Sequence, residues 1–167
     1  MGVYIGMMDN LAVLTYGLMA VQQCTVYSKV DYLPGYPYNC NMNGIEFTII
    51  RVGMLPDVTI VGVYRSPQIS VQQMYIALRN LLCSLPITSY QLFLGDFNMN
   101  WFEISNQNPL YRLLVKEYYR QLISEFTTDN RTCIDHVYTN LNDKDIKTRV
   151  YESYFSDHKP IFVILQT

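Results

Sequence analysis

The sequence predicts one domain of mixed α/β (α+β) class, built as a layered sandwich. The chain has 167 residues, which fits one domain and leaves little room for a second. Half of its residues are hydrophobic and 16% are charged, which excludes a disordered or low-complexity chain. Strand-like runs alternate with two helix-like segments, and 15 tyrosines supply side chains suited to half-buried strand positions.

The first half of the chain is expected to contain strands joined by turns. Residues 16–26 have strand composition, whereas residues 31–44 are rich in proline, glycine and asparagine and are expected to form a loop. Two strands follow at residues 45–52 and 58–64, and a short turn with glycine and proline joins them. This spacing predicts a β-hairpin.

A helix with one apolar face is expected after the hairpin. Ser70 and Gln73 form a capping-box pattern at its start, and Pro86 ends it. The apolar face carries residues at helical spacing: Val71, Met74, Leu78, Leu81, Leu82 and Leu85. A short buried strand then follows at residues 91–94 and leads directly into Gly95-Asp96.

The last third is expected to hold a second helix and three strands. Pro109 opens the helix, which is expected to run to about residue 123. Its inward side chains are expected to be Leu110, Leu113, Leu114 and Tyr118. The strands are expected at residues 134–139, 147–154 and 160–165.

The charge balance and the cysteines limit the classes of function. There are 12 Lys and Arg against 14 Asp and Glu, a net charge of −2, so any binding of nucleic acid would have to rest on a local site. The four cysteines are scattered. Cys133 and His136 have the spacing of metal ligands, but no second pair accompanies them, so free thiols in a reducing compartment are favoured. The N-terminal residues are not typical of a signal peptide, and no apolar run approaches the ~18 residues of a membrane span. We therefore expect a soluble intracellular protein, nuclear or cytoplasmic.

Three polar clusters stand at the expected ends of strands. They are Gly95-Asp96-Phe97-Asn98, Asp135-His136 and Ser156-Asp157-His158. The chain has only two histidines, and each directly follows an aspartate. Carboxylates can hold a hard divalent cation and orient water, and histidine can transfer a proton or stabilise charge. The clusters therefore indicate metal-assisted phosphate chemistry.

These motifs match those of a known family. Leu94-Gly95-Asp96-Phe97-Asn98, Ile134-Asp135-His136 and the segment from Ser156 to Ile161 resemble the endonuclease/exonuclease/phosphatase superfamily in order and rough spacing, as does Gly62-Val63-Tyr64-Arg65-Ser66-Pro67. The resemblance covers about residues 17–166 and is nearest to endonuclease domains of retrotransposons and related mobile elements, which resemble abasic-site endonucleases and DNase I. It implies a four-layer αββα sandwich of the DNase I type, incomplete at its N-terminus. Residues 1–167 would then form a single domain holding roughly the C-terminal two-thirds to three-quarters of the family domain.

The resemblance also implies catalytic roles. His158 resembles the histidine that acts at the scissile phosphate, as a base or as a stabiliser of the pentacovalent charge. Asp135 resembles the aspartate that orients that histidine. Asp96 resembles the residue that aligns or deprotonates the attacking water.

Further residues match the substrate and metal positions of the family. Asn98 resembles the asparagine that holds a phosphate oxygen and the Asp96 carboxylate. Tyr64 resembles the tyrosine that contacts the phosphate, although a core aromatic is an equally good interpretation. Asp157 and Asp96 are the implied carboxylates on the side of the metal, which would be Mg²⁺, with Mn²⁺ as an alternative.

One family feature is not found. Family members begin with a strand that carries an asparagine and a second strand that carries the glutamate that is the principal Mg²⁺ ligand. The early acids here are Asp9, Asp31 and Glu46, and Glu46 falls in a later hairpin strand where it is not assigned to the metal. The resemblance therefore implies a chain that begins after those two strands, which would expose a sheet edge capable of self-association.

Structural interpretations compete with these roles. Asp96 and Asn98 are also common turn residues. Because neighbours in a strand face opposite ways, Asp135 is expected to point into the site and His136 to be structural. Arg65 is expected to be a solvated charge at a strand end rather than a phosphate contact, and Trp101 is expected to pack rather than to stack on a base.

Three functions follow as alternatives. The first is a Mg²⁺-dependent phosphodiesterase, a DNA-nicking endonuclease domain of a mobile element with DNA as substrate, within a larger polyprotein or in a reverse transcriptase or helicase context. The second is a catalytically inactive, truncated remnant of that domain. The third keeps the chemistry but acts on a phosphoinositide, sphingomyelin or an RNA tail, because one fold supports many substrates.

Overall fold

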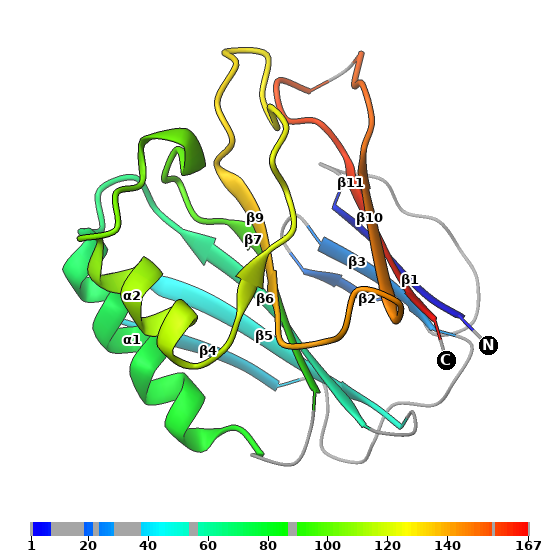
Figure 1. Ribbon diagram of the computed structural model, residues 1–167, viewed down its shortest axis with the longest axis horizontal. Coiled ribbons are helices and arrows are strands. Elements are labelled where there is room, and N and C mark those ends of the chain that lie inside the picture. The colour runs from blue at the N-terminus through cyan, green and yellow to red at the C-terminus, as the bar shows by residue number, and fades with distance from the viewer. Residues whose placement is uncertain are drawn as a thin grey trace.

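The computed structural model describes residues 2–7, 19–21, 24–28, 38–53, 57–86, 90–154 and 156–166. These residues form two β-sheets, and two α-helices cover the six-stranded one (Figure 1). The strands of the six-stranded sheet, in spatial order, are β4 (Tyr38–Met42), β5 (Ile45–Val52), β6 (Val58–Arg65), β7 (Tyr90–Asp96), β9 (Asp135–Thr139) and β8 (Arg120–Gln121). Those of the five-stranded sheet are β10 (Ile146–Val150), β11 (Ile161–Gln166), β1 (Gly2–Met7), β3 (Cys24–Ser28) and β2 (Met19–Val21).

The centre of the six-stranded sheet follows the sequence prediction. β5 and β6 pair antiparallel as the predicted hairpin, and β6 pairs parallel with β7 after a crossover through α1 (Val71–Ser84). The helix begins with the expected capping box, because the Ser70 hydroxyl accepts from the Gln73 backbone and the Gln73 side chain accepts from the Ser70 backbone. β7 then pairs antiparallel with β9.

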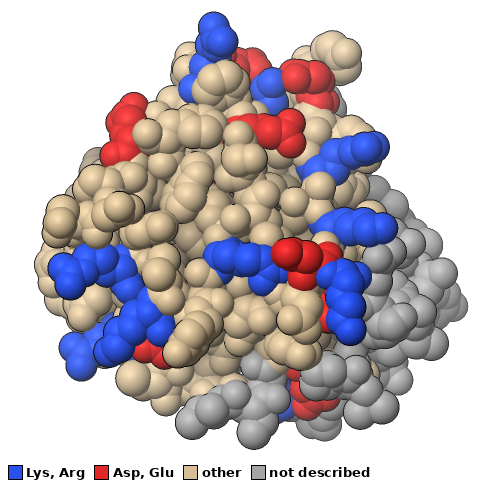
Figure 2. Space-filling view, in the orientation of Figure 1, with Lys and Arg blue, Asp and Glu red and all other residues tan. Residues whose placement is uncertain are grey.

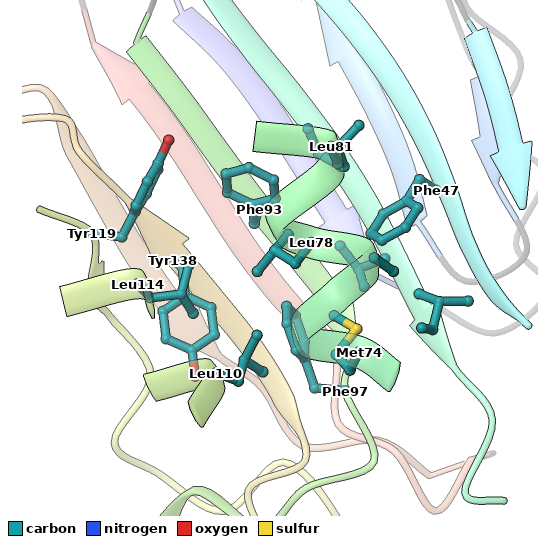
Figure 3. Close-up of a cluster of buried hydrophobic side chains, with 14 of the residues drawn as sticks. Phe47, Met74, Leu78, Leu81, Phe93, Phe97, Leu110, Leu114, Tyr119 and Tyr138 are labelled. Carbon is teal, nitrogen blue, oxygen red and sulfur yellow. The ribbon is translucent and has the colours of Figure 1, made fainter. Parts of the chain in front are cut away.

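Two hydrophobic cores separate the layers, and the alternation of strand side chains assigns residues to them. Leu92 and Leu94 of β7 pack between the two sheets, whereas Phe93 packs under the helices. Figure 3 shows the second core, with Met74, Leu78 and Leu81 of α1 facing the aromatic side chains of the sheet. The helix α2 (Pro109–Lys116) contributes Leu110 and Leu114 to the same core.

The second helix is shorter than its apolar spacing predicts. It ends at Lys116, and Tyr118 adopts φ 63° and is 88% exposed, so the predictions of a helix to about residue 123 and of an inward Tyr118 are wrong. The left-handed backbone at Tyr118 ends the helix and turns Tyr119 inward instead. Tyr119 packs edge to face on Phe93 at 5.3 Å between ring centroids and donates a hydrogen bond to Gln91.

The predicted loop at residues 31–44 is wrong for its last part. Residues 38–42 form β4, which pairs with β5 across Asn43 and Gly44, both at positive φ (56° and 82°). Asn-Gly with two positive φ values is the signature of a two-residue hairpin turn, a signal that the proline-rich context obscured. Residues 31–37 lie outside the described residues.

The remaining strands agree in part with the predictions. Within residues 16–26, residues 19–21 and 24–26 lie in β2 and β3, and the others lie outside the described residues. The expected strand at 147–154 ends at Val150, whereas β9 and β11 are within a residue of their predicted ranges. β1, which was not predicted, pairs antiparallel with β11 and with β3.

The predicted fold class, a mixed α/β sandwich rich in strands, is confirmed. In the described residues no helix covers the outer face of the five-stranded sheet, so the fourth layer implied by the resemblance is not among them. None of the helices in the described ranges has the length and apolar character that a membrane span requires.

The packing of α1 on the sheet predicts a large difference between two neighbouring positions. Leu78 is 0% exposed within the helix–sheet core, whereas Ile76 on the same helix is 42% exposed. We expect Leu78→Ala to lower the free energy of unfolding by about 2–5 kcal/mol. The matched control Ile76→Ala should change it by less than about 1 kcal/mol, since surface substitutions have small effects. Urea denaturation of the two variants measures both values, and equal losses would contradict this packing.

Candidate active site

Three polar side chains lie on one rung of the six-stranded sheet. Asp96, the last residue of β7, is the register partner of Tyr64 on β6 and of Asp135 on β9. Register partners point to the same face, and Asp96 follows Leu92 and Leu94 at strand spacing, so this face is the one turned toward the second sheet. The rung therefore closes one end of the space between the sheets with polar groups.

Gly95 allows β7 to reach this position. Its φ is +149°, and a Cβ atom at this residue would lie 1.8 Å from the backbone oxygen of Val63 in β6. No side chain fits in so close an approach of two backbones. The glycine of the Gly-Asp-Phe-Asn motif is thus a packing requirement that sets where Asp96 stands.

Asp96 and Asn98 form a closed turn. Both carboxylate oxygens of Asp96 accept from Asn98, from its backbone N–H at 2.8 Å and from its amide Nδ2 at 2.9 Å. The second amide hydrogen of Asn98 is donated to the backbone oxygen of Arg65 at 2.8 Å. Asn98 adopts φ 47°, a left-handed conformation that asparagine tolerates better than most residues. The amide therefore orients the carboxylate and ties this turn to the end of β6.

Arg65 is a buried clamp on the same turn. Its side chain donates hydrogen bonds to the backbone oxygens of Phe97, Asn98 and Ile69, and the residue is 4% exposed. Burial lowers the pKa of the guanidinium, and the nearby Asp96 carboxylate opposes that shift. The expectation of a solvated charge at a strand end is wrong, because the planar guanidinium satisfies three carbonyls at once.

His158 is held by Asp135. Its Nδ1 lies 3.0 and 3.1 Å from the two carboxylate oxygens of Asp135, so Nδ1 carries the proton and donates it. Asp135 is buried, and the His158 side chain is 24% exposed. The hydrogen bond that His158 donates to Asp135, opposed by burial and aided by the charges of Asp135, Asp96 and Asp157, raises the pKa of His158 to about 9. The imidazole is therefore a cation at neutral pH.

Thr127 connects the segments that carry Asp135 and His158. Its hydroxyl accepts from the backbone N–H groups of Ile134 and Asp135 at 3.1 and 3.2 Å, and its backbone oxygen accepts from Lys159 at 2.8 Å. The next residue, Thr128, forms a β-bridge with His158. Sequence reasoning missed Thr127, since a threonine in a loop carries no signal for such a role.

His136 lies on the opposite face of β9 and is fully buried. Its Nε2 lies 2.9 Å from the oxygen of Met99 and 3.1 Å from that of Cys133, so Nε2 carries the proton, and Nδ1 accepts from the Tyr138 hydroxyl. Burial lowers the pKa of His136 to about 4, although the two carbonyl hydrogen bonds oppose the shift. A neutral His136 thus joins the segment after Asn98 to the segment before Asp135.

Asp96 is the least compensated charge of the site. Burial, followed by the neighbouring Asp135 charge, raises its pKa to about 6, while the hydrogen bond from Asn98 and the charges of His158 and Arg65 act in the opposite direction. Among the described residues no cation forms an ion pair with Asp96. Asp96 can therefore exist in both protonation states near neutral pH.

The predicted site residues differ in how the structure places them. Asp96 with Asn98 and Asp135 with His158 form two hydrogen-bonded pairs whose charges interact. Tyr64 shares their rung and is half-buried. Asp157 is exposed and enters the site through its charge, one of those that raise the pKa of His158. Glu46 continues the same rung on β5 as the partner of Tyr64 and is exposed, whereas Asp9 and Asp31 lie outside the described residues.

The described part of the chain holds no group of three or more His, Cys, Asp or Glu side chains arranged to bind a metal ion. The predicted pair of carboxylates nevertheless has suitable chemistry. Mg²⁺ is commonly held by one or two carboxylates, with water and substrate oxygens completing its shell. Among the described residues the buried Asp96 carboxylate has no ion-pair partner and fits such a cation, and the Asp157 side chain is exposed.

Comparison with known proteins identifies the family. A sequence profile of the endonuclease/exonuclease/phosphatase family matches residues 14–158. The chain belongs to this family. No curated protein matches the sequence at a significant level.

Several solved structures share the fold of this chain. A family member from Beutenbergia cavernae superposes with a TM-score of 0.65 at 13% identity, over 97% of this chain and 52% of that protein. A humanized D. rerio TDP2 gives 0.62 at 14% identity, over 86% of this chain and 71% of that one. The cytolethal distending toxin of Actinobacillus actinomycetemcomitans gives 0.60 at 15% identity, over 84% and 61%. The fold is therefore DNase I-like, and the chain spans about half the length of the B. cavernae protein.

The Arg65 clamp predicts that a substitution lowers the stability of the fold even when the positive charge is kept. Arg65→Lys keeps the positive charge but replaces the planar guanidinium, whose three nitrogens each reach one carbonyl, with a single nitrogen. One ammonium group cannot match this geometry, so we expect the free energy of unfolding to fall by about 3 kcal/mol. The matched control is Arg51→Lys, because Arg51 forms a partly exposed ion pair with Asp57 at 3.0 Å. We expect the control to lose less than about 1 kcal/mol. Urea denaturation measures both variants, and a control that loses as much as Arg65→Lys would refute the clamp.

The pair of His158 and Asp135 predicts that stability depends on pH. Because the pKa of His158 rises from 6.5 in the unfolded chain to about 9 in the folded one, the pair stabilises the protein fully below pH 6.5 and loses this effect through pH 9. We expect the urea midpoint of the wild type to fall over this range more steeply than that of Asp135→Asn. Parallel pH curves for the two proteins would show that the pair contributes nothing.

Proposed function

We propose that the chain is a divalent-metal-dependent phosphodiesterase that nicks DNA, as an endonuclease domain of a mobile element. One observation carries this proposal: His158, oriented by Asp135 at 3.0 Å, shares a site with the separately oriented carboxylate Asp96. Family membership supports hydrolysis of phosphodiesters as the reaction class. A fixed cation beside a carboxylate that can accept a proton is what in-line attack of water on phosphate requires.

His158 is proposed to stabilise the negative charge that develops on the phosphate. With a pKa of about 9 it is protonated at neutral pH, so its Nε2–H can donate to a phosphate oxygen while Nδ1–H stays on Asp135. A fixed donor of this kind stabilises the charge that develops on the equatorial oxygens. Asp135 is then a positioning residue that also keeps the imidazole charged.

Asp96 is proposed to orient and deprotonate the attacking water. Its pKa of about 6 leaves most molecules ionised at neutral pH while keeping the carboxylate basic enough to accept a proton. Both amide hydrogens of Asn98 are already donated, one to Asp96 and one to Arg65, which supports an orienting role for Asn98. A phosphate oxygen would have to displace one of these hydrogen bonds. Tyr64, on the same rung, is proposed to contact the phosphate.

Asp96 and Asp157 are the residues proposed to hold Mg²⁺, or Mn²⁺ in its place. A bound divalent cation would supply positive charge for the phosphate oxygens and would lower the pKa of a coordinated water. Neutralising Asp96 would also relieve its repulsion with Asp135, which is a cause of its raised pKa. Asp135 orients His158, and Asp96 is proposed to orient the water.

The activity test is nicking of supercoiled plasmid by the purified chain with Mg²⁺ and with EDTA. We expect nicking only with Mg²⁺, and we expect His158→Ala to reduce the rate by about 10²–10⁴-fold, the range of a positioned proton-transferring or charge-stabilising group. Tyr154→Ala, in the same loop region and 96% exposed, is the matched control and should keep full activity. Bis(p-nitrophenyl) phosphate, assayed in parallel, reports the chemistry without a need for DNA binding.

The outcomes separate the alternatives. Cleavage of the small diester without plasmid nicking would exclude DNA as the substrate and favour another phosphodiester. A folded wild-type chain that cleaves neither substrate would refute the enzymatic proposal and leave the inactive remnant as the better interpretation.

A further inference from the structure

A groove runs between α1 and α2 on one face of the six-stranded sheet. The row of Tyr64, Asp96 and Asp135, called the catalytic rung below, lies on the opposite face. Its volume is about 1090 Å³, and it is lined by residues of both helices and of the segment that precedes α2. The catalytic carboxylates point between the two sheets, whereas both helices pack on the opposite face. The groove is therefore a separate feature from the site of Asp96 and His158.

The groove is positively charged, although the whole chain is not. Of the described residues that line it, Arg79 from α1 and Arg112 and Lys116 from α2 are cations, and Glu117 is the one acid. Figure 2 shows blue side chains gathered over the two helices at the left edge of the molecule. Within the described residues none of the three cations forms an ion pair. Three uncompensated cations on a chain of net charge −2 form a local site for an anion.

Two tyrosines line the same groove. Tyr75 and Tyr111 are both half-buried, one from each helix. Tyr111 also packs against Trp101 with 5.8 Å between ring centroids. Aromatic rings among cations are the combination that single-stranded nucleic acid uses, because bases stack on the rings while phosphates meet the charges. A poly-acidic peptide would use the cations but would offer the two rings no base to stack on.

The groove is connected to the catalytic motif through the chain. Asn106 and Gln107, which line the groove, belong to the segment between the Gly-Asp-Phe-Asn turn and Pro109. Trp101 follows Asn98 by three residues, and its backbone N–H donates to Cys133, two residues before Asp135. The segment that lines part of the groove therefore continues along the chain into the loop that carries Asn98.

We propose that the groove between α1 and α2 binds a short stretch of single-stranded nucleic acid, next to the strand that the catalytic site cleaves. This inference rests on the proposed function for its choice of nucleic acid as the ligand. Arg79, Arg112 and Lys116 contact phosphates, and Tyr75 and Tyr111 stack on bases. The groove would thus give the nucleic acid a second binding site on a chain that has no overall surplus of positive charge.

The test compares two triple variants that remove the same charge. Arg79→Gln/Arg112→Gln/Lys116→Gln removes the cations of the groove, and Lys144→Gln/Lys147→Gln/Arg149→Gln removes three exposed cations on and beside β10. Fluorescence anisotropy measures binding of a short fluorescein-labelled single-stranded oligonucleotide, in EDTA to prevent cleavage, across a range of salt concentrations. We expect the groove variant to bind at least about tenfold more weakly and to lose about 2 from its salt slope, since each phosphate contact on a single strand contributes about 0.7. The β10 variant should behave like the wild type.

Cys83 provides a second readout that locates the ligand. It lines the groove and is exposed with a free thiol, whereas Cys133 is buried and burial raises its pKa to about 12. Alkylation of Cys83 by iodoacetamide, followed by mass spectrometry, should slow at least about threefold when the oligonucleotide saturates the wild type. Unchanged alkylation in the presence of bound oligonucleotide would overturn the proposal.

Three further results would decide whether the groove binds nucleic acid. Equal binding by the two triple variants, or no oligonucleotide binding by the wild type, would overturn the groove as a nucleic-acid site. Poly-glutamate that binds the groove more tightly than the oligonucleotide would assign it to an acidic peptide instead. Cleavage of bis(p-nitrophenyl) phosphate by both variants keeps the proposed chemistry separate, because that small substrate does not need the groove.

Discussion

The antiparallel pairing of β7 with β9 is the constraint on which the site depends, because it makes Asp96 and Asp135 direct partners in one register. Two buried carboxylates on adjacent strands repel each other, and each needs compensation. His158 supplies it to Asp135 through a hydrogen-bonded ion pair, and Asn98 supplies hydrogen bonds to Asp96. A slip of one residue in this pairing would put Asp96 and Asp135 on opposite faces of the sheet, so the same register that buries Leu94 and Val137 also forms the site.

The neighbourhood of this pair gives the two histidines opposite chemistry. His158 faces a carboxylate and has a raised pKa, whereas His136, one residue after Asp135, faces two carbonyl oxygens in an apolar core and has a lowered one. The first is a partly exposed cation, and the second is a neutral connection between two loops. Alternation along β9 separates Asp135, which binds His158, from His136, since adjacent residues point to opposite faces of the sheet.

Much of the central sheet was predictable because its signals are local. The hairpin of residues 45–64, the capping box at Ser70 and the glycine before Asp96 each depend on neighbours close in sequence. Predictions of secondary structure failed where the backbone conformation of one or two residues overrode a longer pattern in the sequence. Tyr118 at positive φ ended a helix that its apolar spacing extended, and the Asn43-Gly44 turn converted part of an expected loop into β4.

The sequence by itself determined the family and the mixed α/β class, and it selected the residues proposed to carry the chemistry, because motifs and strand periodicity depend on residues close together in the chain. Only the tertiary structure decided how those residues are held. The contact of Arg65 with Phe97 and that of Thr127 with Lys159 each join segments about 30 residues apart, and no local pattern encodes such a contact. The cationic groove was equally invisible, because Arg79 and Arg112 become neighbours only when α1 and α2 pack on the same sheet.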